Sequence, residues 1–160
     1  MGSNQKLLRR LARLFLGMLA FLAFGSLATP ASAQCITQHE EGSWRNADPN
    51  TRSLTTADLR FTCQDQVLNG QLYPPGPPWH VHLWGKCHPT DCDWSEVGAQ
   101  SVTIGSRSFV YAFYDQGFAK RHVYADMSLY RPGQLWIWMW TDFVDPGRAD
   151  YESQNWFVRR

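Results

Sequence analysis

Hydrophobic and polar residues alternate along most of the chain after position 42, and turn-forming residues interrupt the alternation at short intervals. A period of two is the pattern of a β-strand with one buried and one exposed face. No segment of this region has a convincing helical period, although a short helix within 48–58 would also fit. The alternation predicts eight strands, at 43–47, 57–63, 79–86, 94–104, 108–114, 119–130, 134–144 and 150–158.

The breaks between these strands are rich in proline, glycine, asparagine and aspartate, which favour turns. Regular short strands joined by turns are typical of one all-β domain. We predict an eight-stranded antiparallel up-and-down barrel, because several strands are apolar on both faces and closure leaves no exposed edge. A β-sandwich is the alternative. The proline-rich insertion at 64–78 is predicted to be an irregular loop.

Residues 1–33 have a different pattern and are predicted to be a signal peptide. Four basic residues precede an apolar run at 14–27, and Ala31-Ser32-Ala33 matches an A-x-A cleavage site after Pro30. The run is short for a membrane span, although an uncleaved anchor is the alternative. Cleavage would leave residues 34–160 as a single β-barrel domain. We expect it to be secreted or periplasmic, with no membrane association.

The charge of the predicted mature domain argues against nucleic acid as a partner. Eleven of the fifteen Lys and Arg residues but all fourteen acidic residues follow position 33, which gives a net charge of −3. Binding to phosphates requires a clustered basic surface, and here the two signs are mixed.

All four cysteines follow the predicted cleavage site, and an even number in a small exported domain indicates two disulfides. Cys87 and Cys92 lie five positions apart around a proline, so we pair them and leave Cys35 with Cys63. The second bridge would close a loop of about 28 residues, worth about 3 kcal/mol. Cysteine ligation of zinc is the alternative, but the second matched pair that such sites use is missing.

Gly42-Ser43-Trp44 on the first predicted strand and Arg159 and Arg160 on the last resemble the lipocalin and avidin type of small barrel. In those barrels a Gly-x-Trp segment packs under an arginine of the final strand. The resemblance implies a calycin-like barrel in which Trp44 and Arg159 are structural. The alternative is an ordinary buried tryptophan.

Longer segments resemble an uncharacterised bacterial family. Residues 44–48 match its W-x-N-x-D motif, and 82–94 match its H-x-W-G-x-C-x-P-T-D-C-D-W motif, with further similarity at 141–143 and 148–151. The chain departs from the pattern at Ser95, where the family has glycine, and in the proline-rich insertion. The resemblance implies no activity.

Trp136, Trp138 and Trp140 fall on one face of the 134–144 strand, and aliphatic residues occupy the other. If the aliphatic face fills the barrel, the tryptophans form an outward stripe suited to sugar rings or to an apolar partner surface. If the tryptophans point inward, they line a ligand cavity. Mutual packing in the core or across strands is the third interpretation.

His80 and His82 share one face of the strand at 79–86, about 7 Å apart, which is a spacing used by metal ligands. A third ligand would come from His88, His122, Asp91 or Glu96. Because the sequence fixes only two of the three or four donors required, we predict no metal and no cofactor. We expect His80, His82 and Trp84 to face outward.

Asp91 and Asp93 lie in or beside the Cys87–Cys92 loop and are predicted to be structural, since short carboxylates satisfy backbone N–H groups in turns. Acid–base chemistry or calcium binding are the alternatives, but the glycine-spaced calcium loop is missing. The sequence also has no nucleophile elbow and no phosphate loop. We therefore expect no catalysis.

These features predict a secreted binding protein for a small molecule or a glycan. The candidate ligand-binding residues are Trp136, Trp138, Trp140, His80, His82 and Trp84. The alternative is a protein-interaction module such as a secreted protease inhibitor, which would insert the loop at 87–92 or at 74–78 into its partner. A metal-dependent enzyme using His80 and His82 is a third hypothesis.

Overall fold

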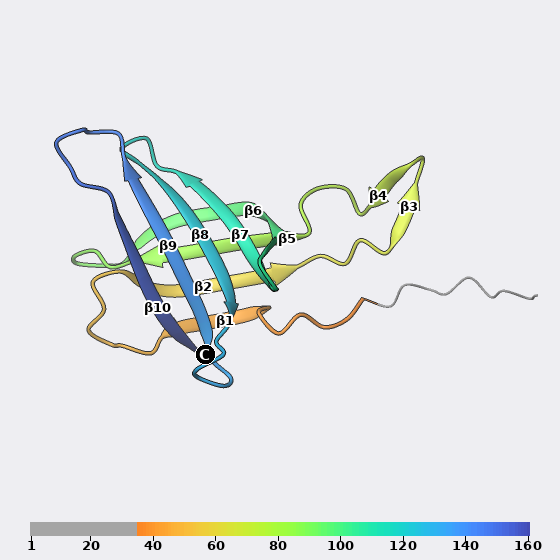
Figure 1. Cartoon of the computed structure of the whole chain (residues 1–160), viewed down its shortest axis with the longest axis horizontal. Helices are drawn as coiled ribbons and strands as arrows, with labels where there is room; N and C mark the ends of the chain where they lie inside the picture. The colour runs from red at the N-terminus through yellow and green to blue at the C-terminus, as the bar shows by residue number, and fades with distance from the viewer. Residues whose placement is uncertain (1–34) are drawn as a thin grey trace, which may run out of the picture. The chain divides into compact units, whose positions relative to one another are not determined.

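The computed structural model of this chain describes residues 35–160, so the predicted signal peptide at 1–33 lies outside the described residues. The described part is all-β, without a helix long and apolar enough to cross a bilayer (Figure 1). Its strands are β1 (Gly42–Asn46), β2 (Leu54–Phe61), β3 (Gln66–Leu68), β4 (Gln71–Tyr73), β5 (Trp79–Gly85), β6 (Cys92–Ile104), β7 (Arg107–Asp115), β8 (Ala119–Met127), β9 (Leu135–Phe143) and β10 (Tyr151–Arg159).

Eight of these strands close into an antiparallel barrel in the order β1-β2-β5-β6-β7-β8-β9-β10, and β10 pairs with β1. The closing register sets Trp44 opposite Arg159. The predicted up-and-down barrel is therefore confirmed, and the sandwich alternative is wrong. Closure satisfies the backbone groups that an open sheet would leave at its two edges.

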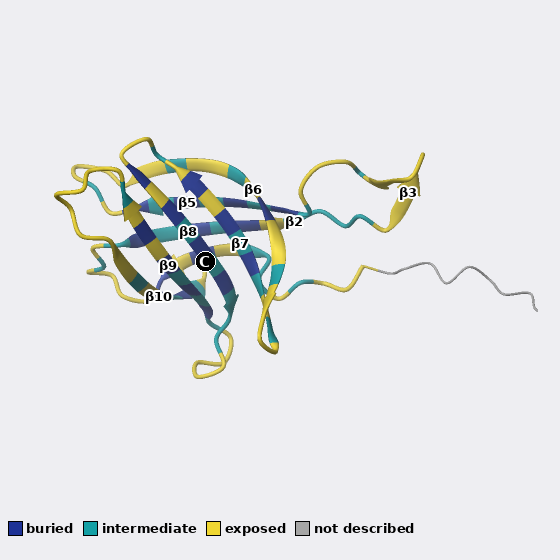
Figure 2. Cartoon of the chain, turned by 45° about the horizontal axis from the view of Figure 1, so that its top comes forward, coloured by how far each residue is buried: buried dark blue, intermediate teal, exposed yellow. Residues whose placement is uncertain are grey.

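Side chains alternate between the barrel interior and its outer surface, which Figure 2 shows as bands of buried and exposed residues along the strands. On β9, the residues at 135, 137, 139 and 141 are buried, whereas those at 136, 138 and 140 are more exposed. The aliphatic face therefore fills the barrel. The core is built from the inward residues of every barrel strand, including Trp44, Leu83, Val123, Ile137 and Phe157.

The barrel has two ends that differ in how they are covered. The Trp44 end is where β1 begins and β10 finishes; the Arg121 end is where β5 finishes and β10 begins. At the Trp44 end, Arg159 donates hydrogen bonds to the carbonyl oxygens of His39 and Glu41. The Trp44 indole donates to the carbonyl oxygen of Glu40 at 2.9 Å. The segment before β1 is thereby held against this end.

The arginine contact expected from the small-barrel resemblance is present. The guanidinium carbon of Arg159 lies 4.4 Å from the centre of the Trp44 ring, and Trp44 is fully buried. Gly42 has a φ of 140°, and a Cβ at this position would collide with Nη1 of Arg159. The Gly-x-Trp spacing therefore leaves room for the arginine that covers the tryptophan.

The insertion at 64–78 corrects one expectation, because it contains a two-stranded sheet rather than only an irregular loop. β3 and β4 form a hairpin that projects from the barrel (Figure 1). Asn69 and Gly70 connect them with φ values of 52° and 80°, the conformation of a type I′ turn. The short helix considered within 48–58 is also wrong, since β2 already begins at Leu54.

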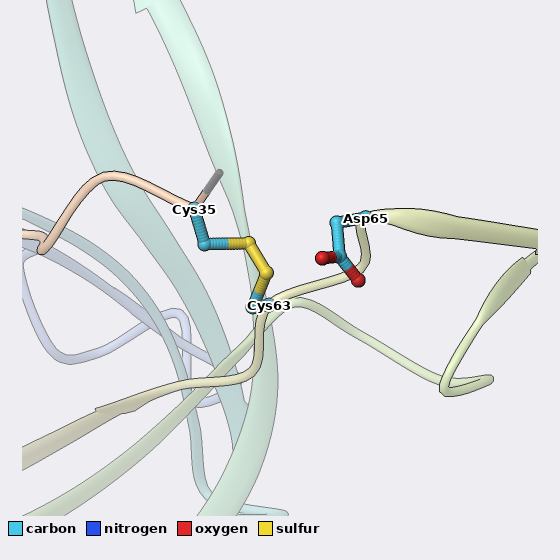
Figure 3. Close-up of side chains that lie close together, drawn as sticks. All are labelled: Cys35, Cys63 and Asp65. Atoms are coloured by element: carbon cyan, nitrogen blue, oxygen red, sulfur yellow. A yellow bond between two sulfur atoms is a disulfide. The ribbon is translucent and has the colours of Figure 1, made fainter. Parts of the chain in front are cut away.

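Both predicted disulfides are present: Cys35 bonds to Cys63, and Cys87 bonds to Cys92. Zinc ligation by these cysteines is therefore wrong. Figure 3 shows the first bridge with Asp65 beside it. Within residues 35–160 these three residues form the one group of three or more potential metal ligands whose binding atoms lie close together. Two of those atoms are the bonded sulfurs, so no thiolate is available to a metal.

Candidate functional site

Trp136, Trp138 and Trp140 point out from β9 and belong to a wider aromatic surface. We call it the aromatic face and define it by eight outward residues of three adjacent strands. These are Phe109, Tyr111 and Phe113 on β7, His122 and Tyr124 on β8, and the three tryptophans on β9. The structure excludes an inward cavity lining and packing in the core, whereas the outward stripe is present and Trp138 packs across strands against Tyr124.

The strand register aligns these rings in rows across the barrel. Tyr111 lies opposite Tyr124, which lies opposite Trp138. The ring centroids in this row are 5.0 Å and 5.2 Å apart. A second row contains Phe113, His122 and Trp140. Ring contacts link seven of the eight residues, and Trp140 adjoins them opposite His122 in the strand register, so the rings form a continuous surface.

The second row is the more exposed part of the aromatic face. Phe113 is 39% exposed and Trp140 is 38% exposed, whereas the rings of the first row are partly covered by their neighbours. Polar atoms lie among the rings: the hydroxyl of Tyr111 is 2.9 Å from Nδ1 of His122, and the indole of Trp138 donates to Glu152 at 3.2 Å. The surface thus combines flat apolar rings with hydrogen-bonding groups.

His80, His82 and Trp84 also face outward, on β5, as expected. Three strands separate β5 from β9 in either direction round the barrel. The six predicted ligand-binding residues therefore form two groups on opposite sides of the barrel. A single small ligand cannot contact both groups.

The β5 group is held by contacts within the protein. The ring of His82 stacks on Trp84 with centroids 3.8 Å apart, and its Nε2 lies 2.5 Å from a carboxylate oxygen of Asp93. Nδ1 of His80 is buried without a hydrogen-bond partner. Neither histidine belongs to a group of three potential metal ligands within the described residues. This geometry does not support the metal-dependent enzyme.

Asp91 and Asp93 both stabilise the region of the Cys87–Cys92 loop, but only one of them does so in the expected way. Asp93 accepts a hydrogen bond from the backbone N–H of Ser95 at 2.7 Å. Its hydrogen bond with His82, and then the bond from Ser95, lower the pKa of the Asp93 carboxyl. Asp91 instead pairs with the ammonium group of Lys86 at 3.4 Å.

The Arg121 end holds a pocket that the sequence did not predict. Its volume is about 520 Å³, and residues of the 85–95 segment, of the 115–118 loop and of β8, β9 and β10 line it. Arg121 and Tyr151 line its base, and Tyr114, Arg121, Thr141 and Tyr151 occupy neighbouring inward positions on four consecutive strands. The sequence did contain a sign of this site, because Arg121 is a charged residue at a buried position of the β8 alternation, between Ala119 and Val123.

Arg121 places a buried positive charge at this end. Burial alone would raise the pKa of Tyr151, but hydrogen bonds with Arg121 and Thr141 and the positive charges of Arg121 and Arg148 outweigh it. The pKa of Tyr151 therefore lies below its ordinary value. Burial raises the pKa of Tyr114, the inward neighbour of Arg121 on β7. The pKa values of Tyr151 and Tyr114, which lie in one row, are therefore shifted in opposite directions.

No protein-family model matches this chain, and no curated protein or solved structure matches it. The resemblances stated from the sequence therefore stay predictions.

Proposed function

We propose that this protein is exported from the cell and binds a glycan on the aromatic face of its barrel. The observation that carries the proposal is the continuous outward surface of eight aromatic side chains on β7, β8 and β9. Contiguous exposed apolar surface is characteristic of interaction sites. The two disulfides are consistent with a location outside the cell, and we propose secretion or a periplasmic location.

The mixture of groups on the aromatic face supports a sugar as the ligand. A sugar ring offers a C–H face for stacking and hydroxyl groups for hydrogen bonds at its edge. The aromatic face offers both partners, because Phe113 and Trp140 provide ring surface and His122 lies between them in the same row. Glu152, opposite Trp140 on β10, adds a carboxylate at the border of this row.

Binding of the full chain to a panel of immobilised polysaccharides tests the proposal. Trp140→Ala and Phe113→Ala should each weaken retention about three- to tenfold, the value of one aromatic contact. Tyr73→Ala is the matched control, since Tyr73 is a similarly exposed aromatic residue on the β3–β4 hairpin. Equal retention of all variants, or no retention on any polysaccharide, would reject glycan binding by the aromatic face.

The β3–β4 hairpin supports protein recognition as a second candidate function. Its side chains at 66–68 and 71–73 are all exposed, and Val67, Leu68 and Leu72 are apolar. The Cys35–Cys63 bridge and two hydrogen bonds from the Gln64 side chain hold its base. A protein partner that binds this hairpin should no longer bind the Leu72→Ser variant but should still bind the Trp140→Ala variant. The reverse result would assign partner binding to the aromatic face.

A further inference from the structure

Arg121 is a charged side chain held inside the barrel, with only 8% of its surface exposed. Its Nε donates to the side-chain oxygen of Gln116 at 2.8 Å. Its Nη1 donates to the hydroxyls of Thr141 at 3.0 Å and Tyr151 at 3.4 Å. All three acceptors are neutral oxygens, so the hydrogen bonds do not balance the charge.

No carboxylate forms an ion pair with Arg121 within residues 35–160. The ion pairs of this region join Arg60 to Glu96, His82 to Asp93, Lys86 to Asp91 and Arg107 to Asp126. Asp93 and Asp115 line the same pocket, but neither forms an ion pair with Arg121: Asp93 is hydrogen-bonded to His82, and Asp115 accepts from the backbone N–H of Gly117. A buried cation without a counter-charge is costly, and an anionic ligand would remove this cost.

The pocket above Arg121 has the size and the lining for a small organic molecule. Its volume of about 520 Å³ is within the usual range for such ligands. Trp94, Phe118 and Met139 give it an apolar wall. The guanidinium carbon of Arg121 lies 4.5 Å from the centre of the Trp94 ring. The polar base and the apolar wall are therefore adjacent.

We propose that this pocket binds a small organic acid, with its carboxylate at Arg121 and Tyr151 and its apolar body against Trp94, Phe118 and Met139. Of the three cations that line the pocket, Arg121 alone is buried, whereas Arg52 and Lys86 are exposed and Lys86 pairs with Asp91. One buried guanidinium balances one negative charge, which favours a carboxylate over a doubly charged phosphate. A neutral sugar would leave the charge of Arg121 unbalanced. This site is separate from the aromatic face, because Arg121 points into the barrel and the aromatic face points out.

Tyr151 supports the assignment and supplies an internal probe. Its lowered pKa indicates that the base of the pocket already stabilises a negative charge, as a bound carboxylate requires. A carboxylate bound beside Tyr151 would oppose ionisation of the phenol. Binding should therefore raise the pKa of Tyr151 back toward its ordinary value.

Isothermal titration calorimetry of the full chain with benzoate, benzamide and inorganic phosphate tests the proposal. Benzoate and benzamide have the same ring, so their difference measures the charge. We expect benzoate to bind at least about tenfold more tightly than benzamide, the usual value of a charged hydrogen bond, and more tightly than phosphate. Equal affinity for benzoate and benzamide, or no detectable benzoate binding, would overturn the proposal. Tighter binding of phosphate would overturn the choice of a carboxylate.

Arg121→Met should remove the preference for benzoate, so that benzoate binds no more tightly than benzamide. Arg60→Met is the control, since Arg60 is exposed on β2 and does not line the pocket. Retention of benzoate binding by Arg121→Met would contradict the proposal. The comparison of ligands on the unaltered chain decides the question even where this variant fails to fold. The pKa of Tyr151, followed by ultraviolet absorbance with and without benzoate, gives a second readout.

Discussion

At the Trp44 end of the barrel, the guanidinium carbon of Arg159 lies 4.4 Å from the Trp44 ring centre, and at the other end that of Arg121 lies 4.5 Å from the Trp94 ring centre. Each arginine–tryptophan pair also has a glycine that leaves space for one of its two side chains. A Cβ at Gly42 would collide with Arg159, and a Cβ at Gly85 would lie 2.8 Å from the indole nitrogen of Trp94. The same side-chain pair is thus built at both ends.

The two pairs differ in the acceptors that their arginines use. Arg159 donates to backbone carbonyl oxygens of the segment before β1, so its hydrogen bonds hold the chain against this end. Arg121 donates only to side chains around an open pocket. The partners of an arginine, rather than the arginine–tryptophan contact itself, therefore distinguish a structural cover from a candidate binding site.

The largest effect should come from removing the tryptophan of the covered end. Trp44→Ala is expected to lower the free energy of unfolding by about 3–5 kcal/mol, because it opens a cavity in a fully buried position. Trp94→Ala should cost less, below about 3 kcal/mol, since this ring is only partly buried. Urea denaturation measures both. An equal or larger loss for Trp94→Ala would show that the Arg121 end is the structural one.

The disulfide at the Trp44 end should likewise contribute more to the free energy of unfolding than the disulfide at the Arg121 end. The Cys35–Cys63 bridge at the Trp44 end spans 28 positions and should contribute about 3–4 kcal/mol, whereas the Cys87–Cys92 bridge spans five and should contribute about 2 kcal/mol. Replacing each pair by serine and measuring chemical denaturation tests the order. A greater loss for the Cys87–Cys92 pair would mean that native contacts of that loop, not loop length, dominate.

The two arginines provide the sharpest test of the comparison. Arg159→Met should cost about 1.5–3 kcal/mol, because it removes charge-assisted hydrogen bonds to two carbonyl oxygens. Arg121→Met should change the free energy of unfolding by less than about 1 kcal/mol, since replacing a buried charge by an apolar chain of similar size is often neutral or stabilising. Thermal and urea unfolding without ligand measure both. A large loss for Arg121→Met would assign Arg121 a structural role.

The smallest effect concerns the ionisation of the two tyrosines next to Arg121. Tyr151 should ionise below its ordinary pKa of about 10, and Tyr151→Phe should remove this first step from an ultraviolet titration. Because the folded-state pKa is lowered, Tyr151 contributes stability only as the pH rises through that pKa, and none near neutrality. Tyr114 should ionise last, with unfolding. A first step that persists in Tyr151→Phe would contradict this assignment.

The barrel strands and the β3–β4 hairpin show where hydrophobic patterns predict strands and where they do not. All eight predicted barrel strands are present, because alternation is a direct consequence of strand geometry. β3 and β4 were missed, since three-residue strands with every side chain exposed have no alternation to detect. Asn69-Gly70 was the available signal, and it marks a type I′ hairpin turn.

The candidate sites show a similar division. Trp136, Trp138 and Trp140 were identified as one face of a strand, but the direction of that face depends on which side the curved sheet encloses. Arg121 was missed, because its significance depends on Gln116, Thr141 and Tyr151 lying around it. The last two stand on other strands, and no local pattern encodes how side chains on separate strands converge inside a closed barrel.

The sequence by itself determined the strand periodicity, the turns between the barrel strands and both cysteine pairings, because each depends on residues close together in the chain or on simple elimination. Only the tertiary structure decided three features. These are the outward direction of the aromatic face, the position of His80 and His82 on the opposite side of the barrel from that face, and the buried charge at the Arg121 end. These depend on barrel closure, which brings strands together whose separation along the chain says nothing about which side chains will share a pocket.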